Sequence, residues 1–339
     1  TSNCGPWNPD YRREWGVVEL DEDGGLTGYR NNYCASILAR DADSGDLIWA
    51  YNMTPQDQWD LDEPNANILV DLEIDGRLRK ALVRPARNGF FYVFDRATGE
   101  MILEPWNFVY NDLIGGVNME TGRPRYDIGK MMFTDLEDRQ KYVPDAEDIA
   151  VGWCPGIAAR NWQNDAFSPR TGLVYTPTSN RCGVQRVVEG QYVPGDGYTL
   201  RERGGQAPRP PGEEYVGELQ ANDPVAGETV WSIPWTSANN TPVMVTGGDL
   251  LFQGGPNEGV VRAFDARTGD IVWTFRTGSN FRNSPITYIG PDGRQYVAII
   301  GSQRTGSAQV TADTEPDAGA RFRRAGSALY VFALPPARN

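Results

Sequence analysis

Apolar residues gather along the chain in short runs that are rich in aromatic and β-branched side chains. Gly, Pro, Asn or Asp bounds each run, as is typical of β-strands separated by turns. The clearest runs are FFYVF (90–94), LVYTPT (173–178), LLFQG (250–254), YVAIIG (296–301) and LYVFAL (329–334). A helical period is rare, and DLEDRQKYV (135–143) is the segment that predicts a short helix. We therefore expect an all-β fold.

One longer pattern recurs among these runs and predicts tight turns. ARDADSGDLIW (39–49), ANDPVAGETVW (221–231) and AFDARTGDIVW (263–273) share Ala, Asp, Gly and Trp at the same spacing. VFDRATGEMIL (93–103) is a fourth copy that lacks the Ala and the Trp, and FSPRTGLVYTP (167–177) is a degenerate fifth. The Asp can accept hydrogen bonds from turn N–H groups, the Gly can adopt positive φ, and the Trp can stack on a neighbouring sheet.

The repeats indicate the blades of a β-propeller, which are units of roughly 40–50 residues with four short strands. Unrelated hairpin turns are the alternative, but the shared register of four residue types in three copies disfavours it. Two poorly patterned stretches, 11–31 and 183–214, are expected to be long insertions in a single domain that spans 1–339. The abrupt start at TSNCGPWN suggests the interior of a longer sequence.

The acidic composition narrows the choice of partners. The net charge is −13, from 45 acidic and 32 basic residues. Such a surface repels phosphate backbones, so nucleic acid is not expected, whereas a basic docking partner or a bound multivalent cation fits. No apolar run approaches the roughly 18 residues that cross a membrane, so no membrane span is expected.

The chain contains no histidine, which excludes His-based catalytic triads, His-ligated zinc and c-type haem. Proton transfer must then use Asp, Glu, Lys, Tyr or water. The four cysteines form no C-x-x-C pair, so a zinc site is not expected. Four buried thiols are one interpretation; we favour a disulfide between Cys154 and Cys182, which flank a strand-rich segment, and a Cys4–Cys34 pair stays open.

A charged stretch that follows a tryptophan contains the candidate catalytic residues. Asp60 and Asp62 follow Trp59, and Arg87 lies in the turn sequence PARNG. A carboxylate can accept a proton, and an arginine supplies a permanent charge with fixed donors. The alternatives are a buried structural ion pair for Asp60 and Arg87, and a surface turn for Asp62.

The Trp-bearing turns resemble the tryptophan-docking motifs of the quinoprotein alcohol dehydrogenases, a methanol- and ethanol-dehydrogenase-like family that uses pyrroloquinoline quinone (PQQ). The motifs follow one another in the family's order over essentially the whole chain. The resemblance is carried by TSNCGPWNP (1–9), SILARDADSGDLIWAYNMTPQDQWDLDEPN (36–65), RPARNGFFYVFDRATGE (84–100), CPGIAARNWQNDAFSPRTGLVY (154–175), YVGELQANDPVAGETVW (215–231) and AFDARTGDIVWTFRTGSN (263–280). The family fold is an eight-bladed β-propeller, and the chain resembles its C-terminal portion, with about half of the blades.

The resemblance implies a role for the candidate residues. Asp60 matches the catalytic carboxylate. Arg87 matches the catalytic arginine that hydrogen-bonds near the reactive quinone carbonyl and so also binds the cofactor. Asn161 and its neighbour Trp162 match cofactor-binding positions.

The same resemblance implies metal ligands. Asn3 and Asp60 match ligand positions, with a simple turn residue as the alternative for Asn3. Asp62 matches an additional carboxylate of the lanthanide-dependent members, where calcium members carry a small uncharged residue. The implied cofactors are therefore PQQ and either Ca²⁺ or a lanthanide ion.

The implied function is the oxidation of an alcohol to an aldehyde or ketone by hydride transfer to metal-bound PQQ in the periplasm. The chain has no haem motif, so electrons would pass to a separate cytochrome c-type acceptor. The family's other metal and quinone contacts would precede Thr1, so a missing N-terminal half of the propeller or a partner chain is expected to complete the site. The alternatives are a non-enzymatic propeller scaffold for assembly or interaction, and an inactive remnant.

Overall fold

The computed structural model describes residues 1, 5–13, 33–156, 158–204, 209–235, 238–239, 241–255, 258–277, 279–302 and 327–334. These residues form an almost entirely β structure, which confirms the expected fold class. The helix predicted in 135–143 is α2 (Leu136–Gln140), which begins after the capping residue Asp135. Two further short helices are α1 (Asp10–Arg13) and η1 (Ile128–Lys130).

Contacts divide the chain into two compact units. Unit 1 comprises Thr1–Trp162, Asn180–Glu214 and Pro224–Gly227. Unit 2 comprises Gln163–Ser179, Tyr215–Asp223 and Glu228–Asn339. The single domain expected from the sequence stays a prediction.

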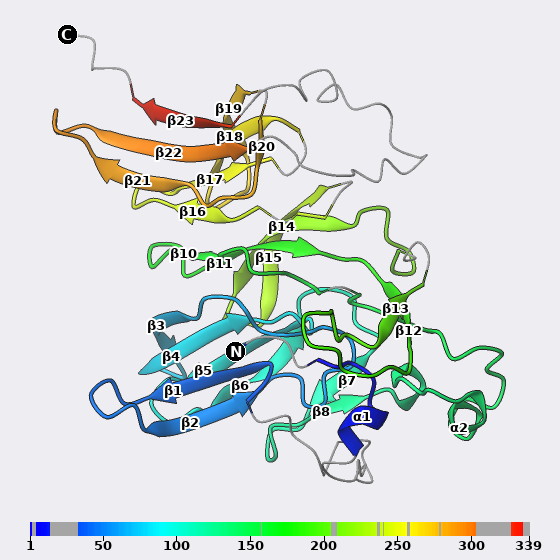
Figure 1. Cartoon of the computed structure of the whole chain (residues 1–339). Helices are drawn as coiled ribbons and strands as arrows, with labels where there is room; N and C mark the ends of the chain where they lie inside the picture. Colours follow the sequence, from blue (N-terminus) through cyan, green and yellow to red (C-terminus); the bar gives the residue numbers. More distant parts are fainter. Residues whose placement is uncertain are drawn as a thin grey trace. The chain divides into compact units, whose positions relative to one another are not determined.

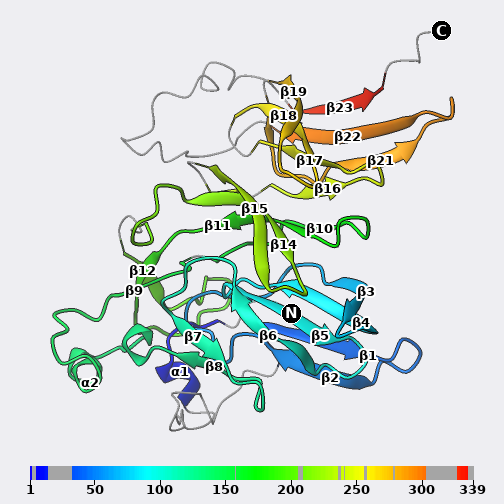
Figure 2. The same cartoon turned by 180° about the vertical axis from the view of Figure 1, so that it is seen from behind.

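Within its described residues, unit 1 holds one four-stranded antiparallel meander and three smaller sheets. The meander consists of β3 (Ile68–Ile74), β4 (Arg77–Pro85), β5 (Phe90–Asp95) and β6 (Met101–Asn107). The smaller sheets are β1 (Ser36–Arg40) with β2 (Leu47–Asn52), β7 (Ile114–Val117) with β8 (Pro124–Tyr126), and β12 (Gly183–Val187) between β9 (Val151–Trp153) and β13 (Arg201–Arg203). The β1–β2 hairpin lies beside the meander (Figures 1 and 2). One apolar core joins these sheets through residues such as Ile37, Leu82, Tyr92, Ile114 and Val151.

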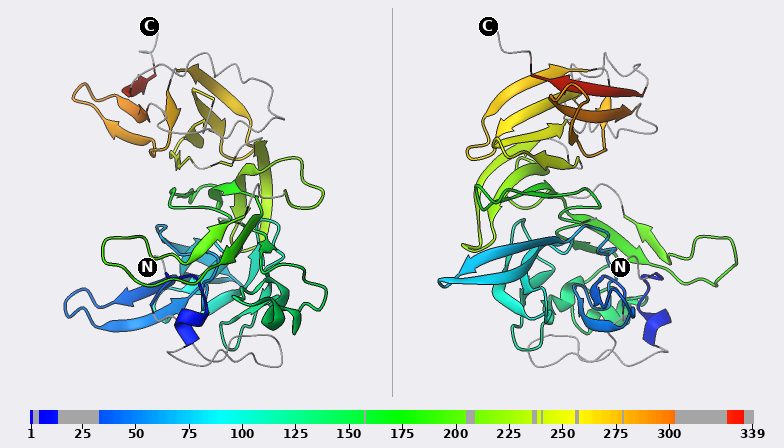
Figure 3. Two further views of the ribbon diagram at one scale, coloured as in Figure 1. Left: turned by 45° about the vertical axis from the view of Figure 1, so that its right-hand side comes forward. Right: turned by 90° about the vertical axis from the view of Figure 1, so that its left-hand side faces the viewer.

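Unit 2 contains three antiparallel sheets of four strands each within its described residues. The first is β10 (Ala166–Phe167), β11 (Val174–Ser179), β14 (Gly217–Asp223) and β15 (Glu228–Trp235). The second is β16 (Val243–Val245), β17 (Leu250–Gly254), β18 (Val260–Asp265) and β19 (Ile271–Arg276). The third is β20 (Asn280–Phe281), β21 (Ile286–Ile289), β22 (Gln295–Ser302) and β23 (Ala328–Ala333), in which β22 pairs with the other three strands. Apolar side chains fill the space between successive sheets, which form layers (Figure 3).

The repeat occupies equivalent hairpins, as the blade interpretation predicts. Its copies lie on the last two strands of three four-stranded sheets, at β5–β6, β14–β15 and β18–β19, and on the β1–β2 hairpin. The four turn glycines have φ between 71° and 79°, so each turn uses the left-handed conformation that glycine adopts without strain. The side chains of Asp41, Asp95 and Asp265 accept turn N–H groups as expected; for example, Asp95 Oδ1 accepts the N–H of Ala97 at 2.9 Å.

Two tryptophans of the repeat, Trp49 and Trp231, each dock on the turn of the next copy. Trp49 Nε1 donates to the carbonyl of Arg96 at 3.2 Å, and its ring covers Gly99 so closely that an added Cβ would lie 2.6 Å from it. Trp231 makes the same contacts with the turn that contains Gly269. Glycine is therefore required at this position for two reasons: it adopts the positive φ, and it leaves space for the indole ring.

The two expected insertions differ in what the structure shows of them. The stretch 183–214 leaves a sheet of unit 2 after β11 and returns at β14, and it contributes β12 and β13 to a sheet of unit 1. The stretch 11–31 begins in α1, and its remainder lies outside the described residues.

Candidate active site

The loop that follows β2 places Asp60 by anchoring the residues on both sides of it. The buried carboxylate of Asp57 accepts the backbone N–H groups of Trp59 and Leu61, each at 3.0 Å. Trp59 is 1% exposed, and its indole donates to the carbonyl of Lys130 at 3.0 Å. Between these two anchored residues, Asp60 has a φ of 69°, a conformation that few residues other than glycine adopt.

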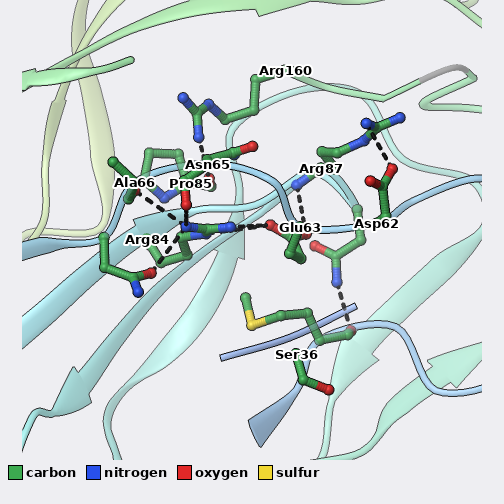
Figure 4. Close-up of polar contacts among 12 residues, drawn as sticks. Ser36, Asp62, Glu63, Asn65, Ala66, Arg84, Pro85, Arg87 and Arg160 are labelled. Carbon is green, nitrogen blue, oxygen red and sulfur yellow. Dashed lines mark hydrogen bonds and ion pairs between the residues drawn. The ribbon is translucent and has the colours of Figure 1, made fainter. Parts of the chain in front are cut away.

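Arg87 contacts three of the predicted site residues. It lies in the turn between β4 and β5 and is 5% exposed. Its NH1 atom lies 2.7 Å from Asp62 Oδ1 and donates to Asn161 Oδ1 at 3.2 Å, and its NH2 atom donates to the backbone carbonyl of Asp60 at 2.7 Å. Figure 4 shows the contact with Asp62. The proximity of these residues is thus observed, whereas their chemical roles stay predictions.

A second buried ion pair supports this arrangement, and sequence reasoning missed it. Glu63 Oε2 lies 2.8 Å from Arg84 NH2, and both side chains are at most 1% exposed (Figure 4). The other oxygen, Oε1, accepts the backbone N–H of Arg87 at 2.9 Å. The pair therefore ties the Asp60 loop to β4 and fixes the backbone of the arginine that the site uses. The sequence feature that could have indicated this ion pair is Arg84, a charged residue in the apolar run ALVRP (81–85).

A further arginine contacts the carboxylate of Asp60. Arg201 NH2, on β13, lies 2.7 Å from Asp60 Oδ2, and its guanidinium stacks 3.8 Å above the ring of Trp7. Sequence reasoning missed Arg201 because it lies 141 residues from its partner, in a stretch interpreted as an insertion. No local pattern indicates such a contact.

Burial makes the carboxyl group of Asp62 a weak acid. Burial is the largest cause that raises its pKa to about 6, and the carboxylates of Asp60, Asp57 and Glu63 act in the same direction. The guanidinium of Arg87 lowers the same pKa without cancelling the rise. The charged form of Asp62 is therefore disfavoured, chiefly by burial and to a lesser extent by the neighbouring carboxylates.

The metal-ligand prediction depends on more than the two aspartates. Asn3 lies outside the described residues. In the part of the chain that the structure describes, no group of three or more Asp, Glu or Cys side chains is arranged to hold a metal ion. Asp60 and Asp62 would therefore bind a cation together with other ligands.

The predicted disulfide is present and lies near the cofactor-binding candidates in sequence. Cys154, directly after β9, is bonded to Cys182, directly before β12. The alternative pair involves Cys4, which lies outside the described residues. Asn161 Oδ1 accepts the backbone N–H of Trp162 at 2.9 Å, and the Trp162 side chain is 48% exposed.

Comparison with known proteins identifies the family. A family model described as the glucose/ethanol/alcohol dehydrogenase β-propeller domain, of the PQQ type, matches residues 16–105 and 212–297, just over half of the chain. The chain therefore belongs to this family of PQQ β-propeller proteins, as the resemblance predicted. None of the helices in the described ranges has the length and apolarity needed to cross a bilayer.

Individual relatives match over nearly the whole chain. A lanthanide-dependent methanol dehydrogenase of Methylacidiphilum fumariolicum is 34% identical over 98% of this chain and 53% of its own length. A quinoprotein alcohol dehydrogenase of Pseudomonas putida is 33% identical over 99% of this chain and 51% of its own. The solved structure of a europium-containing methanol dehydrogenase matches with a TM-score of 0.80 at 33% identity, over 98% of this chain and 56% of that chain. The chain thus spans about half the length of the relatives it matches.

Proposed function

We propose that the chain contributes the proton-accepting carboxylate to a PQQ- and metal-dependent alcohol dehydrogenase, which oxidises an alcohol to an aldehyde or ketone. One observation carries the proposal. In a chain of this family, the guanidinium of Arg87 contacts the side chains of Asp62 and Asn161 and the backbone carbonyl of Asp60 at 3.2 Å or less. A scaffold has no need to converge these groups on one buried arginine.

The chemistry of these residues fits the two cofactors. Asp60 and Asp62 offer carboxylate oxygens, which Ca²⁺ and lanthanide ions prefer as ligands. A cation near Asp62 would stabilise its charged form, which burial and the neighbouring carboxylates disfavour. Arg87 and Asn161 would hold the quinone, and Trp162 would contact it from an exposed position. PQQ, when bound, would supply the electrophilic carbonyl that accepts the hydride.

The step that the side chains of this chain would perform is removal of the hydroxyl proton of the alcohol. Asp60 is the residue proposed to accept it, because Arg201 holds its carboxylate and Arg87 holds its backbone. A guanidinium carries a permanent charge and a rigid set of donors, so Arg87 serves as a fixed charge and donor.

The remaining partners are part of the same proposal. We propose that further blades, from the same polypeptide or from a partner chain, complete the propeller, because the relatives are about twice as long. A cytochrome c-type protein would accept the electrons. The disulfide between Cys154 and Cys182 supports a periplasmic location, since disulfides persist in oxidising compartments.

The test is removal of the proposed proton acceptor in the complete propeller loaded with PQQ and Ca²⁺ or La³⁺. Asp60→Asn should lower alcohol-dependent dye reduction by about a hundredfold or more, because general base catalysis contributes at least that much. Asp75→Asn, at an exposed turn with φ of 53°, is the matched control and should leave the rate unchanged. Full activity in Asp60→Asn would contradict the proposal, and inactive wild-type protein would favour the scaffold.

The choice of metal has its own test. Asp62→Ala should abolish dye reduction with La³⁺ and spare it with Ca²⁺, because a trivalent ion needs the additional negative charge. Titration of each ion into the wild type and Asp62→Ala, without alcohol, should show that the substitution weakens the binding of La³⁺ and spares that of Ca²⁺. Equal losses with both ions would refute the lanthanide assignment.

A further inference from the structure

We propose that Arg201 is a positioning residue that orients the carboxylate of Asp60 for proton transfer. The inference rests on the proposed function, in which Asp60 accepts the proton. It adds a residue from β13, in a stretch that the local sequence pattern interprets as an insertion.

The contact between Arg201 and Asp60 is short and shielded from water. Arg201 NH2 lies 2.7 Å from Asp60 Oδ2, and the two side chains are 10% and 14% exposed. Ion pairs with so little exposure are screened less than surface pairs, and they hold one geometry more firmly. Arg87 NH2 donates to the backbone carbonyl of Asp60 at 2.7 Å. Two guanidinium groups therefore hold this one residue, one at its backbone and one at its side chain.

Arg201 is itself held in place from two directions. Its guanidinium stacks 3.8 Å above the ring of the buried Trp7, which fixes the plane of the donor fork. Its NH1 atom reaches Gln185 Oε1 at 3.5 Å, and Gln185 Nε2 donates to the carbonyl of Gln58 at 2.6 Å. The strand pair β12–β13 therefore contacts the Asp60 loop at two residues, Gln58 and Asp60.

The disulfide connects the strand pair β12–β13 to the rest of unit 1. Cys182 directly precedes β12, and Cys154 directly follows β9, which is the other neighbour of β12 in the sheet. The covalent bond fixes the strand that carries Gln185 and, through its pairing with β13, Arg201. Arg201 therefore reaches Asp60 Oδ2 from a strand pair that the disulfide holds in place.

The experiment compares two arginines on the same face of one strand, in the complete propeller loaded with PQQ and metal. Arg201→Gln should lower kcat for dye reduction by about tenfold to a hundredfold, the usual effect of a catalytic group displaced by about 1 Å. The melting temperature and the Kd for PQQ should stay unchanged. Arg203→Gln is the control, because Arg203 is 61% exposed and 3.9 Å from the same oxygen. Its kcat should equal that of the wild type.

Chemical rescue separates positioning from a merely structural role. Guanidinium ion added to Arg201→Ala should restore part of kcat, because it can occupy the same place beside Asp60 Oδ2. Arg201→Lys keeps the charge but offers a single nitrogen, so an intermediate kcat is expected, and this variant decides the case if Arg201→Gln does not fold. A wild-type kcat in Arg201→Lys and Arg201→Gln, or a lowered melting temperature without guanidinium rescue, would overturn the inference. If Asp60→Asn is inactive while Arg201→Gln is fully active, this inference alone fails; if Asp60→Asn is active, the proposed function fails with it.

Discussion

The acidity of Asp62 shows how a single residue responds to its surroundings. Its side chain is 5% exposed, and its contact with Arg87 at 2.7 Å would by itself favour the charged form. Burial and three nearby carboxylates outweigh this contact and raise the pKa to about 6. Without a cation, the environment therefore disfavours the ionised form of Asp62.

This shift predicts a pH dependence of stability in the metal-free chain. The folded chain holds the Asp62 proton more tightly than the unfolded chain, in which the pKa is about 4. The contribution of Asp62 to the free energy of unfolding should therefore be largest below about pH 4 and fall as pH rises to about 6. Urea unfolding between these pH values should show a smaller fall in Asp62→Asn than in the wild type. Parallel curves would contradict the assigned cause.

The turn and the docked indole form the structural element that repeats along the chain. Gly45 and Gly99 have nearly the same φ, 77° and 78°, but differ in their surroundings. An added Cβ at Gly99 would meet the ring of Trp49, whereas at Gly45 nothing among the described residues lies within 4 Å. A related turn ends at Gly122, where the hydroxyl of Tyr51 donates to the glycine carbonyl at 2.7 Å.

The paired glycines allow backbone strain and docking to be measured separately. Gly45→Ala should lower the free energy of unfolding by about 1 kcal/mol, the usual cost of a left-handed φ in a residue with a Cβ. Gly99→Ala should cost a further ~1–3 kcal/mol, because the indole of Trp49 must move. Urea denaturation of both variants gives the difference. Equal losses would show that the indole does not depend on this glycine.

Charge acts at the scale of the whole molecule. The chain carries a net charge of −13, which would attract a basic electron acceptor over long distances and accelerate the encounter. Attraction of this kind is screened within about 10 Å at 0.1 M salt. The proposed cytochrome partner can therefore be tested through ionic strength.

Reduction of a basic cytochrome c by the complete propeller should slow by about tenfold as salt rises from about 0.02 M to 0.2 M. Reduction of an uncharged dye is the control and should change little, because a neutral acceptor is not steered. Stopped-flow absorbance of the cytochrome follows the rate directly. A rate that is independent of salt would argue against electrostatic docking of the acceptor.

Local patterns predicted the elements of this protein and part of its site. The Asp-x-x-x-Gly turns, the strands around them and α2 follow from contacts within a few residues, so their sequences are sufficient to indicate them. The motif around Asp60, Asp62 and Arg87 was also recognisable, because its members lie within short segments that resemble the family. In the structure, the guanidinium of Arg87 contacts the side chain of Asp62 and the backbone carbonyl of Asp60.

Tertiary structure alone decided which charges meet at the site. The partners of Arg84 and Arg201 lie 21 and 141 residues away, and no sequence period connects such positions. Their pairing depends on how separate sheets of unit 1 come together around the Asp60 loop. The pKa of Asp62 likewise depends on burial, which a sequence does not specify residue by residue. Short-range chemistry thus determined the elements, and long-range packing determined the electrostatics of the site.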